Sequence, residues 1–313
     1  MKAAILTSYG TADVLEISDV PYPQLQADEV LVHVHAAAVN PKDTFIRKGR
    51  FRRFSGNRFP MLAGFDFAGE VSEVGEMVTM TKVGDAVYGM LDGWQGGAFA
   101  EYVAVKANQL SQKPEILTFE EAAAMPLVSL TALQALRDKA SIKERQQVCI
   151  NGASGGVGSM AVQIANIHKT LVTAISDKHN HDFLHQLGAA ECIDYHHADI
   201  TKNESRFNIF FDVFGNQRFK AIKPILKHRG VWVSTVVQPH VFLSVAKTMF
   251  FSRKKAKLVV VKSSREDLTK VREWVQIGEL KPIIHEIYPL ERIREAYAQQ
   301  ETKHTRGKVV IRI

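Results

Sequence analysis

Three evenly spaced glycines, Gly152, Gly155 and Gly158, form a turn whose chemistry would be phosphate binding. They follow a short apolar run, QVCI at 147–150, and precede a segment in which apolar residues recur at helical spacing. Such a turn places unpaired backbone N–H groups and the positive end of a helix dipole beside a bound anion. Gly155 and Gly156 have no Cβ to block a pyrophosphate, and Gly158 allows close packing of helix and strand. The segment therefore predicts a dinucleotide site.

The residues after the next expected strand, LVTAIS at 171–176, indicate which dinucleotide would bind. An NAD site places an acid at this strand end, whereas an NADP site surrounds the 2′-phosphate with a small hydroxyl and a cation. Ser176 and Lys178 fit the second pattern, so we predict NADPH as the cofactor. Asp177 keeps the alternative open, because a shift of one or two residues would make it the acid of an NAD site.

The sequence has only two cysteines and shows no evident group of three metal ligands. Cys149 and Cys192 each lie in an apolar run typical of a strand, which indicates free thiols in a reducing, cytoplasmic setting. His33 and His35 share one strand face without a third ligand. The segment HNHDFLH at 179–185 is more typical of an exposed helix. We therefore expect no bound metal.

The segment RKGRFRRFSGNR at 47–58 carries six cations and no acid, with Phe51 and Phe54 between them. Cations mixed with aromatic rings can bind nucleic acid, or can form a lid over a site for acidic substrates. The formal net charge of +7 over 313 residues is only moderate. We favour a solvated surface loop and do not expect nucleic acid as a partner.

The chain changes character twice, and its 313 residues suit two domains. Short alternating runs over residues 1–117 predict a mainly β domain. A helix is expected from Thr118, where Glu121 completes a capping box. Strand-like runs then alternate with helical segments, which predicts a parallel sheet with helices on both faces. These runs are 147–150, 171–176, 191–195, 208–214, 230–237 and 257–262.

The C-terminal tail returns to strand, helix and strand, and we expect it to join the N-terminal domain. The predicted domains are 1–120 with 264–313, and 121–263. The longest apolar region, 241–251, contains Lys247 and is too short to span a bilayer. The run HVFLSVAKTMFF at 240–251 instead predicts an apolar surface through which the nucleotide domain forms a homodimer.

Seven stretches spread over the whole chain are characteristic of one protein family. They are AAAVNPKDTFIRKG (36–49), PMLAGFDFAGEVSEVGEMVTMTKVGDAVYG (60–89), GGAFAEYVAV (96–105), AAAMPLVSLTALQAL (122–136), NGASGGVGSMAVQIA (151–165), LGAAECIDY (187–195) and the closing GKVVIRI. Because of these stretches, the whole chain resembles the medium-chain dehydrogenase/reductase superfamily, in its zinc-independent quinone oxidoreductase (zeta-crystallin-like) branch. The resemblance implies an α/β protein. A GroES-like, mainly β catalytic domain would enclose a Rossmann domain with a doubly wound parallel sheet.

The resemblance also implies which residues meet the cofactor. They are Asn40 and Thr131 near the nicotinamide; Ser154, Gly155, Gly156 and Val157 at the pyrophosphate; Ser176, Lys178 and Tyr195 at the adenosine phosphate; and Phe214, Gly215 and Lys308 further along the channel. Structural alternatives exist for three of them. Tyr195 can cap a sheet edge, Thr131 can be a hydroxyl inside a helix, and Lys308 can be a surface charge.

The substrate side departs from the pattern of the branch. Branch members often carry tyrosines where this chain has Phe45 and Phe51, which removes a phenolic proton donor. The histidine ligand of zinc-dependent relatives is replaced by Phe65, in Gly64-Phe65-Asp66. These three phenylalanines are the expected substrate residues.

Together these features predict an NADPH-dependent reductase of quinones or α,β-unsaturated carbonyls. Without zinc nothing here stabilises an alkoxide, whereas a quinone or enone needs only a positioned hydride and a hydrogen bond to its oxygen. Asn40 is the expected catalytic residue, because its amide can orient nicotinamide or donate to a carbonyl. Lys42 and Asp43 beside it are expected to be solvated turn residues. The alternative is an NADPH-binding regulatory or RNA-binding protein with incidental turnover.

Overall fold

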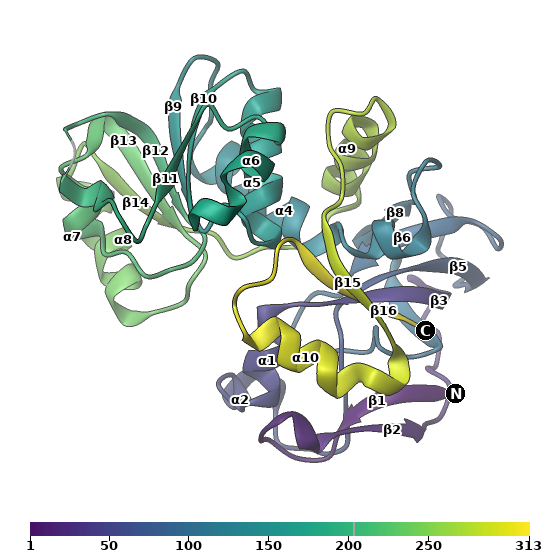
Figure 1. Ribbon diagram of the computed structural model, residues 1–313. Helices are drawn as coiled ribbons and strands as arrows, with labels where there is room; N and C mark the ends of the chain where they lie inside the picture. The colour runs from purple at the N-terminus through teal and green to yellow at the C-terminus, as the bar shows by residue number, and fades with distance from the viewer. Residues whose placement is uncertain (203) are drawn as a thin grey trace. The chain divides into compact units, whose positions relative to one another are not determined.

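The computed structural model describes residues 1–202 and 204–313, which form two compact units (Figure 1). Unit 1 contains Met1–Leu127 and Lys262–Ile313, and unit 2 contains Val128–Val261. The first division lies later than the expected position after residue 120. The reason is that helix α3 (Phe119–Ala123) packs on strands of unit 1 and does not open unit 2.

Unit 1 is built around a seven-stranded sheet in the order β15-β16-β3-β5-β6-β8, with β7 also paired to β3. Its strands are β3 (Glu29–Val39), β5 (Asp66–Val74), β6 (Ala86–Met90), β7 (Tyr102–Lys106), β8 (Leu110–Gln112), β15 (Ile284–Pro289) and β16 (Lys308–Arg312). A second sheet, in the order β2-β1-β4, contains β1 (Lys2–Leu6), β2 (Leu15–Asp19) and β4 (Met61–Leu62). The C-terminal tail joins the N-terminal part, because β16 pairs antiparallel with β3 and sets Val310 opposite Ala38.

The helices of unit 1 start where local capping allows. They are α1 (Pro41–Arg47), α2 (Arg52–Ser55), α3, α9 (Arg265–Gln276) and α10 (Ile293–Glu301), with short turns η1 (Ala12–Val14), η2 (Ala107–Gln109) and η6 (Leu290–Arg292). The predicted capping box of α3 is confirmed, since Thr118 and Glu121 each accept a hydrogen bond from the other's backbone N–H. The expected continuous helix is interrupted, because Pro126 lacks an N–H and opens a new helix, α4 (Pro126–Gln134).

Unit 2 holds a six-stranded parallel sheet in the order β11-β10-β9-β12-β13-β14. The strands are β9 (Gln147–Asn151), β10 (Leu171–Ser176), β11 (Glu191–Asp194), β12 (Phe207–Asp212), β13 (Leu226–Ser234) and β14 (Lys255–Leu258). The chain moves outward from β9 to β11, then crosses to β12 and moves outward again. The strand order therefore reverses between β9 and β12, and the predicted doubly wound sheet is confirmed.

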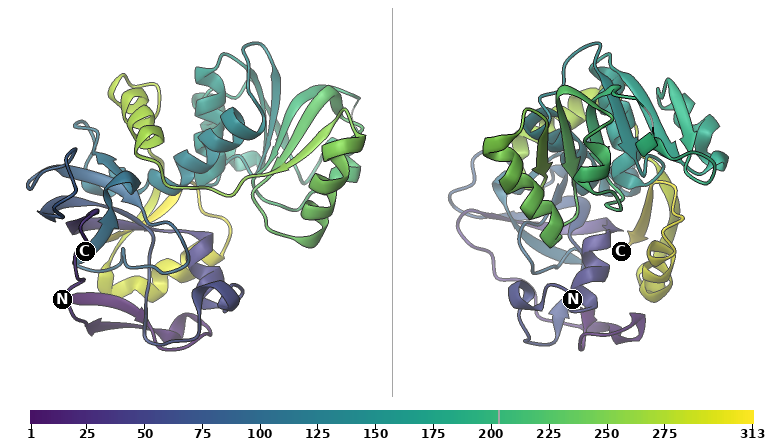
Figure 2. Two further views of the ribbon diagram at one scale, coloured as in Figure 1. Left: turned by 180° about the vertical axis from the view of Figure 1, so that it is seen from behind. Right: turned by 90° about the vertical axis from the view of Figure 1, so that its left-hand side faces the viewer.

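Helices cover both faces of this sheet (Figure 2). They are the end of α4 with its continuation η3 (Ala135–Lys139), then η4 (Lys178–Asn180), η5 (Ile200–Lys202), α5 (Gly156–Ile167), α6 (His181–Gln186), α7 (Phe219–Ile222) and α8 (Pro239–Phe251). The strands between them are apolar because both sides are covered, as for Phe210 of β12 and Trp232 of β13, which are fully buried. Polar residues are left for the strand ends, where the chain leaves the core.

Candidate active site

The glycine-rich turn of unit 2 joins the end of β9 to the start of α5. Gly152 has a φ of +81°, in the left-handed region that favours glycine. A Cβ on Gly158 would stand 2.1 Å from the carbonyl oxygen of Gly152, so α5 packs against the turn too closely for a side chain. Among the described residues, a Cβ on Gly155 would meet that oxygen alone, at 3.8 Å. Open space therefore borders Gly155.

This open space fits the pyrophosphate of a dinucleotide. Gly155 is the N-cap of α5 and has no side chain to bond the first N–H groups of the helix. Those groups and the helix dipole attract an anion. Ser154, Gly156 and Val157, which the sequence also assigned to the pyrophosphate, lie half-buried around the same helix start.

Two polar residues that sequence reasoning missed end the strands at the point where the sheet order reverses. The Asn151 side chain at the end of β9 donates to Asp212 at the end of β12, at 2.7 Å, and to Asn216 at 2.8 Å. Asp212 also accepts from the backbone N–H groups of Gly215, at 2.9 Å, and Gln217, at 3.1 Å. Burial raises the pKa of Asp212, although these hydrogen bonds oppose the rise. A polar residue closing an apolar strand was the available sequence signal.

The loop held by Asp212 contains the two residues assigned to the cofactor channel. Gly215 has a φ of +76°, and a Cβ there would lie 1.9 Å from a methyl carbon of Val236, so glycine is required. Phe214 beside it is exposed. Ligands of such sheets bind where the strand order reverses, outside the carboxyl ends of the strands. Both residues therefore lie at the edge where a dinucleotide is expected.

The end of β10 groups the residues assigned to the adenosine phosphate. Ser176 is buried and donates to the carbonyl of Asp177 at 3.0 Å. Asp177 accepts from the backbone N–H of His179 at 2.9 Å and lies 3.2 Å from Nε2 of His196, and the His179 N–H is the main cause of its lowered pKa. Lys178 is exposed. Asp177 is thus engaged as a helix cap, and His196 is a neighbour that the sequence did not reveal.

Tyr195 and Thr131 complete the residues assigned to the cofactor in unit 2. Tyr195 is 50% exposed, and its ring centroid lies 4.3 Å from that of His196. Thr131 is a buried residue of α4. The structure therefore brings Tyr195 to the Asp177 group at the end of β10, while Thr131 belongs to a separate element.

Unit 1 contains a buried polar cluster made of Asn40, Asp66 and Lys308. The Lys308 ammonium donates to the Asn40 side-chain oxygen, to the Val39 carbonyl at 2.9 Å and to Asp66 at 3.2 Å. The Asn40 amide donates to Asp66 at 3.0 Å and to the Ala38 carbonyl at 3.2 Å. Burial raises the pKa of Asp66, and the Lys308 charge opposes that rise.

The cluster determines the surroundings of two residues that were assigned to the cofactor, Asn40 and Lys308. All of its side chains are buried, so Lys308 is an interior ion-pair partner and not a surface charge. Both N–H groups of the Asn40 amide already have protein acceptors. With its side chain committed in this way, Asn40 can position the start of α1, which follows it directly.

Asp43 corrects one sequence expectation, because it is only 2% exposed and is not a solvated turn residue. One of its oxygens accepts from the Asn40 backbone N–H at 2.6 Å and closes a capping box on α1. The other has no hydrogen-bond partner among the described residues. Burial is the main cause that raises the pKa of Asp43 to about 7.

Asp43→Asn is expected to remove a pH dependence of folding. The raised pKa means that the folded protein keeps this proton to about pH 7, whereas an unfolded aspartate loses it near its ordinary value of 3.8. Stability relative to the variant should fall as pH rises through this interval, by at most about 1.4 kcal/mol per pH unit. Urea unfolding of both proteins across the interval measures it. A pH-independent difference in unfolding free energy would contradict the prediction.

Three aromatic side chains form a wall in unit 1. It consists of Phe45, Phe51 and Trp94, with ring centroids 6.3 Å apart for the two phenylalanines and 4.7 Å apart for Phe51 and Trp94. Phe65 is buried, and the Lys42 ammonium lies 3.5 Å from the centroid of its ring and 5.8 Å from that of Trp94. Lys42 is half-buried among rings and is not a solvated turn residue. Trp94 had no sequence signal beyond its type.

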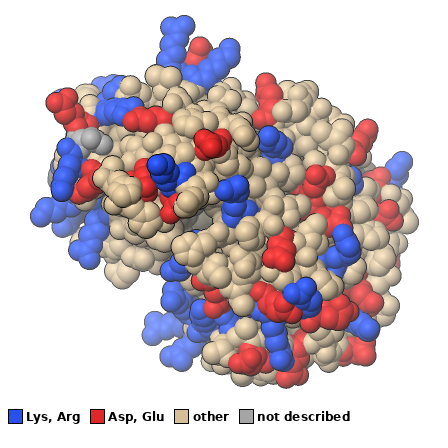
Figure 3. Space-filling view, in the orientation of Figure 1, with Lys and Arg blue, Asp and Glu red and all other residues tan. Residues whose placement is uncertain are grey.

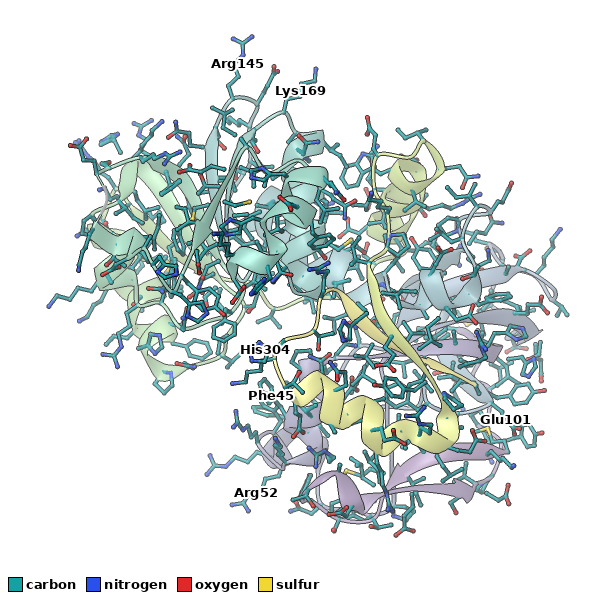
Figure 4. The ribbon with its side chains drawn as sticks, in the orientation of Figure 1. Phe45, Arg52, Glu101, Arg145, Lys169 and His304 are labelled. Carbon is teal, nitrogen blue, oxygen red and sulfur yellow. The ribbon has the colours of Figure 1, made fainter. Side chains whose placement is uncertain are left out.

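The basic segment divides into structural and exposed cations. Arg47 is fully buried; it donates to the Gly10 carbonyl at 2.8 Å and pairs with Glu301, which also pairs with Lys48 at 2.9 Å. Arg52 is exposed and points away from the unit (Figure 4). Lys and Arg side chains gather on one part of the surface in the same orientation (Figure 3). The expected solvated loop therefore describes α2 and not Arg47.

Residues 1–202 and 204–313 contain neither a group of side chains that could hold a metal nor a helix that could span a membrane. They contain no group of three or more His, Cys, Asp or Glu side chains placed to hold a metal ion. No helix formed by them has the length and apolar character needed to cross a membrane. Both cysteines in this part of the chain are free thiols, with Cys149 buried.

Known proteins resemble this chain over its full length. The family model of the alcohol dehydrogenase GroES-like domain matches residues 26–115, and the family model of zinc-binding dehydrogenases matches residues 187–311. The 2-methylene-furan-3-one reductase of Solanum lycopersicum is 35% identical, over 99% of this chain and 79% of its own. The NADPH-dependent alkenal/one oxidoreductase, chloroplastic, of Arabidopsis thaliana is 33% identical, over 99% and 79%. The structure of the quinone oxidoreductase from Coxiella burnetii has a TM-score of 0.92 at 33% identity, covering 100% of this chain and 99% of that one.

A GroES-like β unit combined with a doubly wound sheet that carries a glycine-rich turn between strand and helix defines a two-domain oxidoreductase that uses NAD(P)H. The relatives narrow this class further. The chain belongs to the medium-chain dehydrogenase/reductase superfamily, in its quinone oxidoreductase-like branch.

Proposed function

We propose that the protein is an NADPH-dependent, zinc-independent reductase that delivers hydride to a quinone or an α,β-unsaturated carbonyl. The observation that carries this proposal is the surrounding of Phe65: a lysine ammonium over its ring and an aromatic wall beside it, in the domain expected to hold the substrate. Flat conjugated acceptors pack well against such rings. The names of the Arabidopsis and Coxiella relatives support the same substrate class.

Zinc does not fit the residues around Phe65. A catalytic zinc needs imidazole, thiolate or carboxylate ligands close together. The Phe65 ring offers no such ligand, and the Lys42 cation over it would repel a metal ion. Both oxygens of Asp66 already accept hydrogen bonds, from Leu127 N–H at 3.0 Å and from Asn40 and Lys308. The proposed reaction therefore does not use zinc.

The contacts of Asp177 support the choice of NADPH. The nicotinamide cofactor supplies the hydride when bound, and the turn at Gly155 would hold its pyrophosphate. Asp177 caps η4 through the His179 N–H and faces His196, so its carboxylate is already engaged and would have to leave these partners to bind ribose hydroxyls. Lys178 is exposed beside it and can approach a 2′-phosphate.

Lys178→Gln is expected to weaken NADPH binding by about 10- to 100-fold, the value of one charge-assisted phosphate contact, and to leave NADH binding nearly unchanged. Lys169→Gln is the matched control, because Lys169 precedes the opposite end of β10 and points away from the fold (Figure 4). Titration calorimetry with both cofactors measures the effect. Equal affinities of the wild type for NADPH and NADH would mean that Asp177, and not Lys178, determines the cofactor preference.

An NADPH-consumption screen across quinones and enones tests the reaction itself. We expect turnover with members of at least one of these acceptor classes and none with simple alcohols and NADP⁺. Tight NADPH binding without turnover of any acceptor would instead favour the regulatory or RNA-binding alternative. The exposed cations around Arg52 are the structural observation that supports this alternative.

The proposal includes a homodimer formed through unit 2 and a location in the cytoplasm. Helix α8 leaves Phe242, Leu243, Met249 and Phe250 exposed, the last of them 73%. An apolar surface of this kind is typical of a protein interface. Light scattering at micromolar concentration should give the mass of two chains, and a single-chain mass would reject the dimer.

The proposed cytoplasmic location rests on the free thiols alone, and the Arabidopsis relative is named as chloroplastic.

A further inference from the structure

The Lys42 ammonium has donors without acceptors. Its Nζ lies on the face of Phe65, at 3.5 Å from the ring centroid, and within 5.8 Å of the Trp94 centroid. Within the described part of the chain, no carboxylate lies within 4.0 Å of it, and it makes no hydrogen bond to protein. An ammonium has three N–H donors. A cation held by rings in this way can offer them to a ligand.

Three carboxylates act on Lys42 from more than 4.0 Å away, and each has at least one oxygen bound to another partner. Asp43 of α1 binds the Asn40 backbone N–H, and Asp66 of β5 binds Lys308. Asp92, which follows β6, accepts from the Ser263 backbone N–H at 2.8 Å. Burial lowers the pKa of Lys42, while the charges of these three groups oppose the change. No side chain is therefore positioned to neutralise the ammonium directly.

We propose that Lys42 is the catalytic acid, which hydrogen-bonds the carbonyl oxygen of the acceptor and protonates it as hydride arrives. The inference rests on the proposed function. Hydride adds to the electrophilic position of the conjugated system, and an electron pair moves onto the carbonyl oxygen. An O–H bond then forms as an N–H bond of Lys42 breaks, and the resulting amine regains a proton from water. The acceptor gains one hydride and one proton, and NADPH becomes NADP⁺.

The position of Lys42 suits this role for two physical reasons. Its position two residues after Asn40, on the first turn of α1, anchors its main chain to the buried cluster around Lys308. Its side chain ends beside the rings of Phe65 and Trp94, where water is partly displaced and a developing oxyanion is stabilised more strongly than in bulk solvent. Proton transfer by a positioned group contributes about 100- to 10,000-fold to the rate.

Lys42→Met is expected to lower kcat by about 100- to 1,000-fold with the acceptor that the wild type turns over best. The affinity for NADPH and the urea midpoint should stay close to those of the wild type. The wild-type rate should fall at alkaline pH as Lys42 loses its proton, and the variant should lack this alkaline limb. Lys82→Met is the matched control, because Lys82 is exposed on a turn of the same unit. It should retain wild-type kcat.

Lys42→Arg provides the second variant and keeps the cation on the ring. A guanidinium remains charged and does not release its proton in this pH range. We expect a folded protein with normal NADPH binding, a kcat lowered by about 10- to 100-fold and no alkaline limb. Wild-type kcat in this variant, or an unchanged alkaline limb in either variant, overturns the inference. A wild-type protein that turns over no acceptor refutes the proposed function instead, before any variant is compared.

Discussion

Lys308→Met should lower the free energy of unfolding by about 3–5 kcal/mol, the loss expected when one member of a buried ion pair is removed. The Lys308 ammonium is buried and binds Asp66, the Asn40 side chain and the Val39 carbonyl. Without it, the Asp66 carboxylate is a buried charge that lacks its cation. Burial already raises the pKa of Asp66, and the variant removes the main effect that opposes this rise.

Two further proteins show whether the unpaired charge is the cause. Arg312→Met removes a cation from the same strand, but its partner Glu120 forms an exposed ion pair, so the loss should stay below about 1 kcal/mol. The double variant Asp66→Asn with Lys308→Met removes both buried charges and should regain part of the stability. Urea unfolding measures all of them. A loss below 1 kcal/mol for Lys308→Met would mean that the pair contributes no more than a surface contact.

Gly155→Ala is expected to weaken NADPH binding by about 10- to 100-fold, because its Cβ would enter the space proposed for the pyrophosphate and disturb charge-assisted hydrogen bonds. The folded protein should tolerate the change. The φ of Gly155 is −73°, and the Cβ would have one neighbour among the described residues, the Gly152 oxygen at 3.8 Å. We expect the free energy of unfolding to change by no more than about 1 kcal/mol, since glycine is only a moderate N-cap.

Gly158→Ala separates packing from binding at the same turn. Its Cβ would stand 2.1 Å from the Gly152 oxygen and 2.7 Å from the Ala153 Cα, so α5 must shift. Overpacking of this kind destabilises by about 1–3 kcal/mol. Calorimetry with NADPH and urea unfolding should therefore show a binding defect without instability for Gly155→Ala, and instability for Gly158→Ala. Unchanged NADPH affinity in Gly155→Ala would exclude this turn as the pyrophosphate site.

The sequence by itself determined the features that depend on near neighbours. The apolar runs now seen as β9 to β13, the Thr118 capping box and the glycine turn all follow from local spacing. The last strand is matched less well, because β14 ends at Leu258 and most of the expected run 257–262 lies beyond it. Strand and helix periodicity is a local property of side chains and backbone. The parallel order of the sheet followed because alternating strands and helices leave few topologies.

Only the tertiary structure decided the environments of the polar residues on the substrate side. Asp43 and Lys42 occupy a Pro-Lys-Asp turn typical of solvent exposure, yet they are removed from water by Phe65, Trp94 and Lys308, which are distant in the chain. Arg47 is likewise buried, and it forms an ion pair with Glu301 of α10, which is distant in the chain. Desolvation and ion pairing depend on which remote segments fold over a residue, and local patterns do not contain that information. A strand from the end of the chain, β16, therefore determines the charge environment of a turn near its beginning.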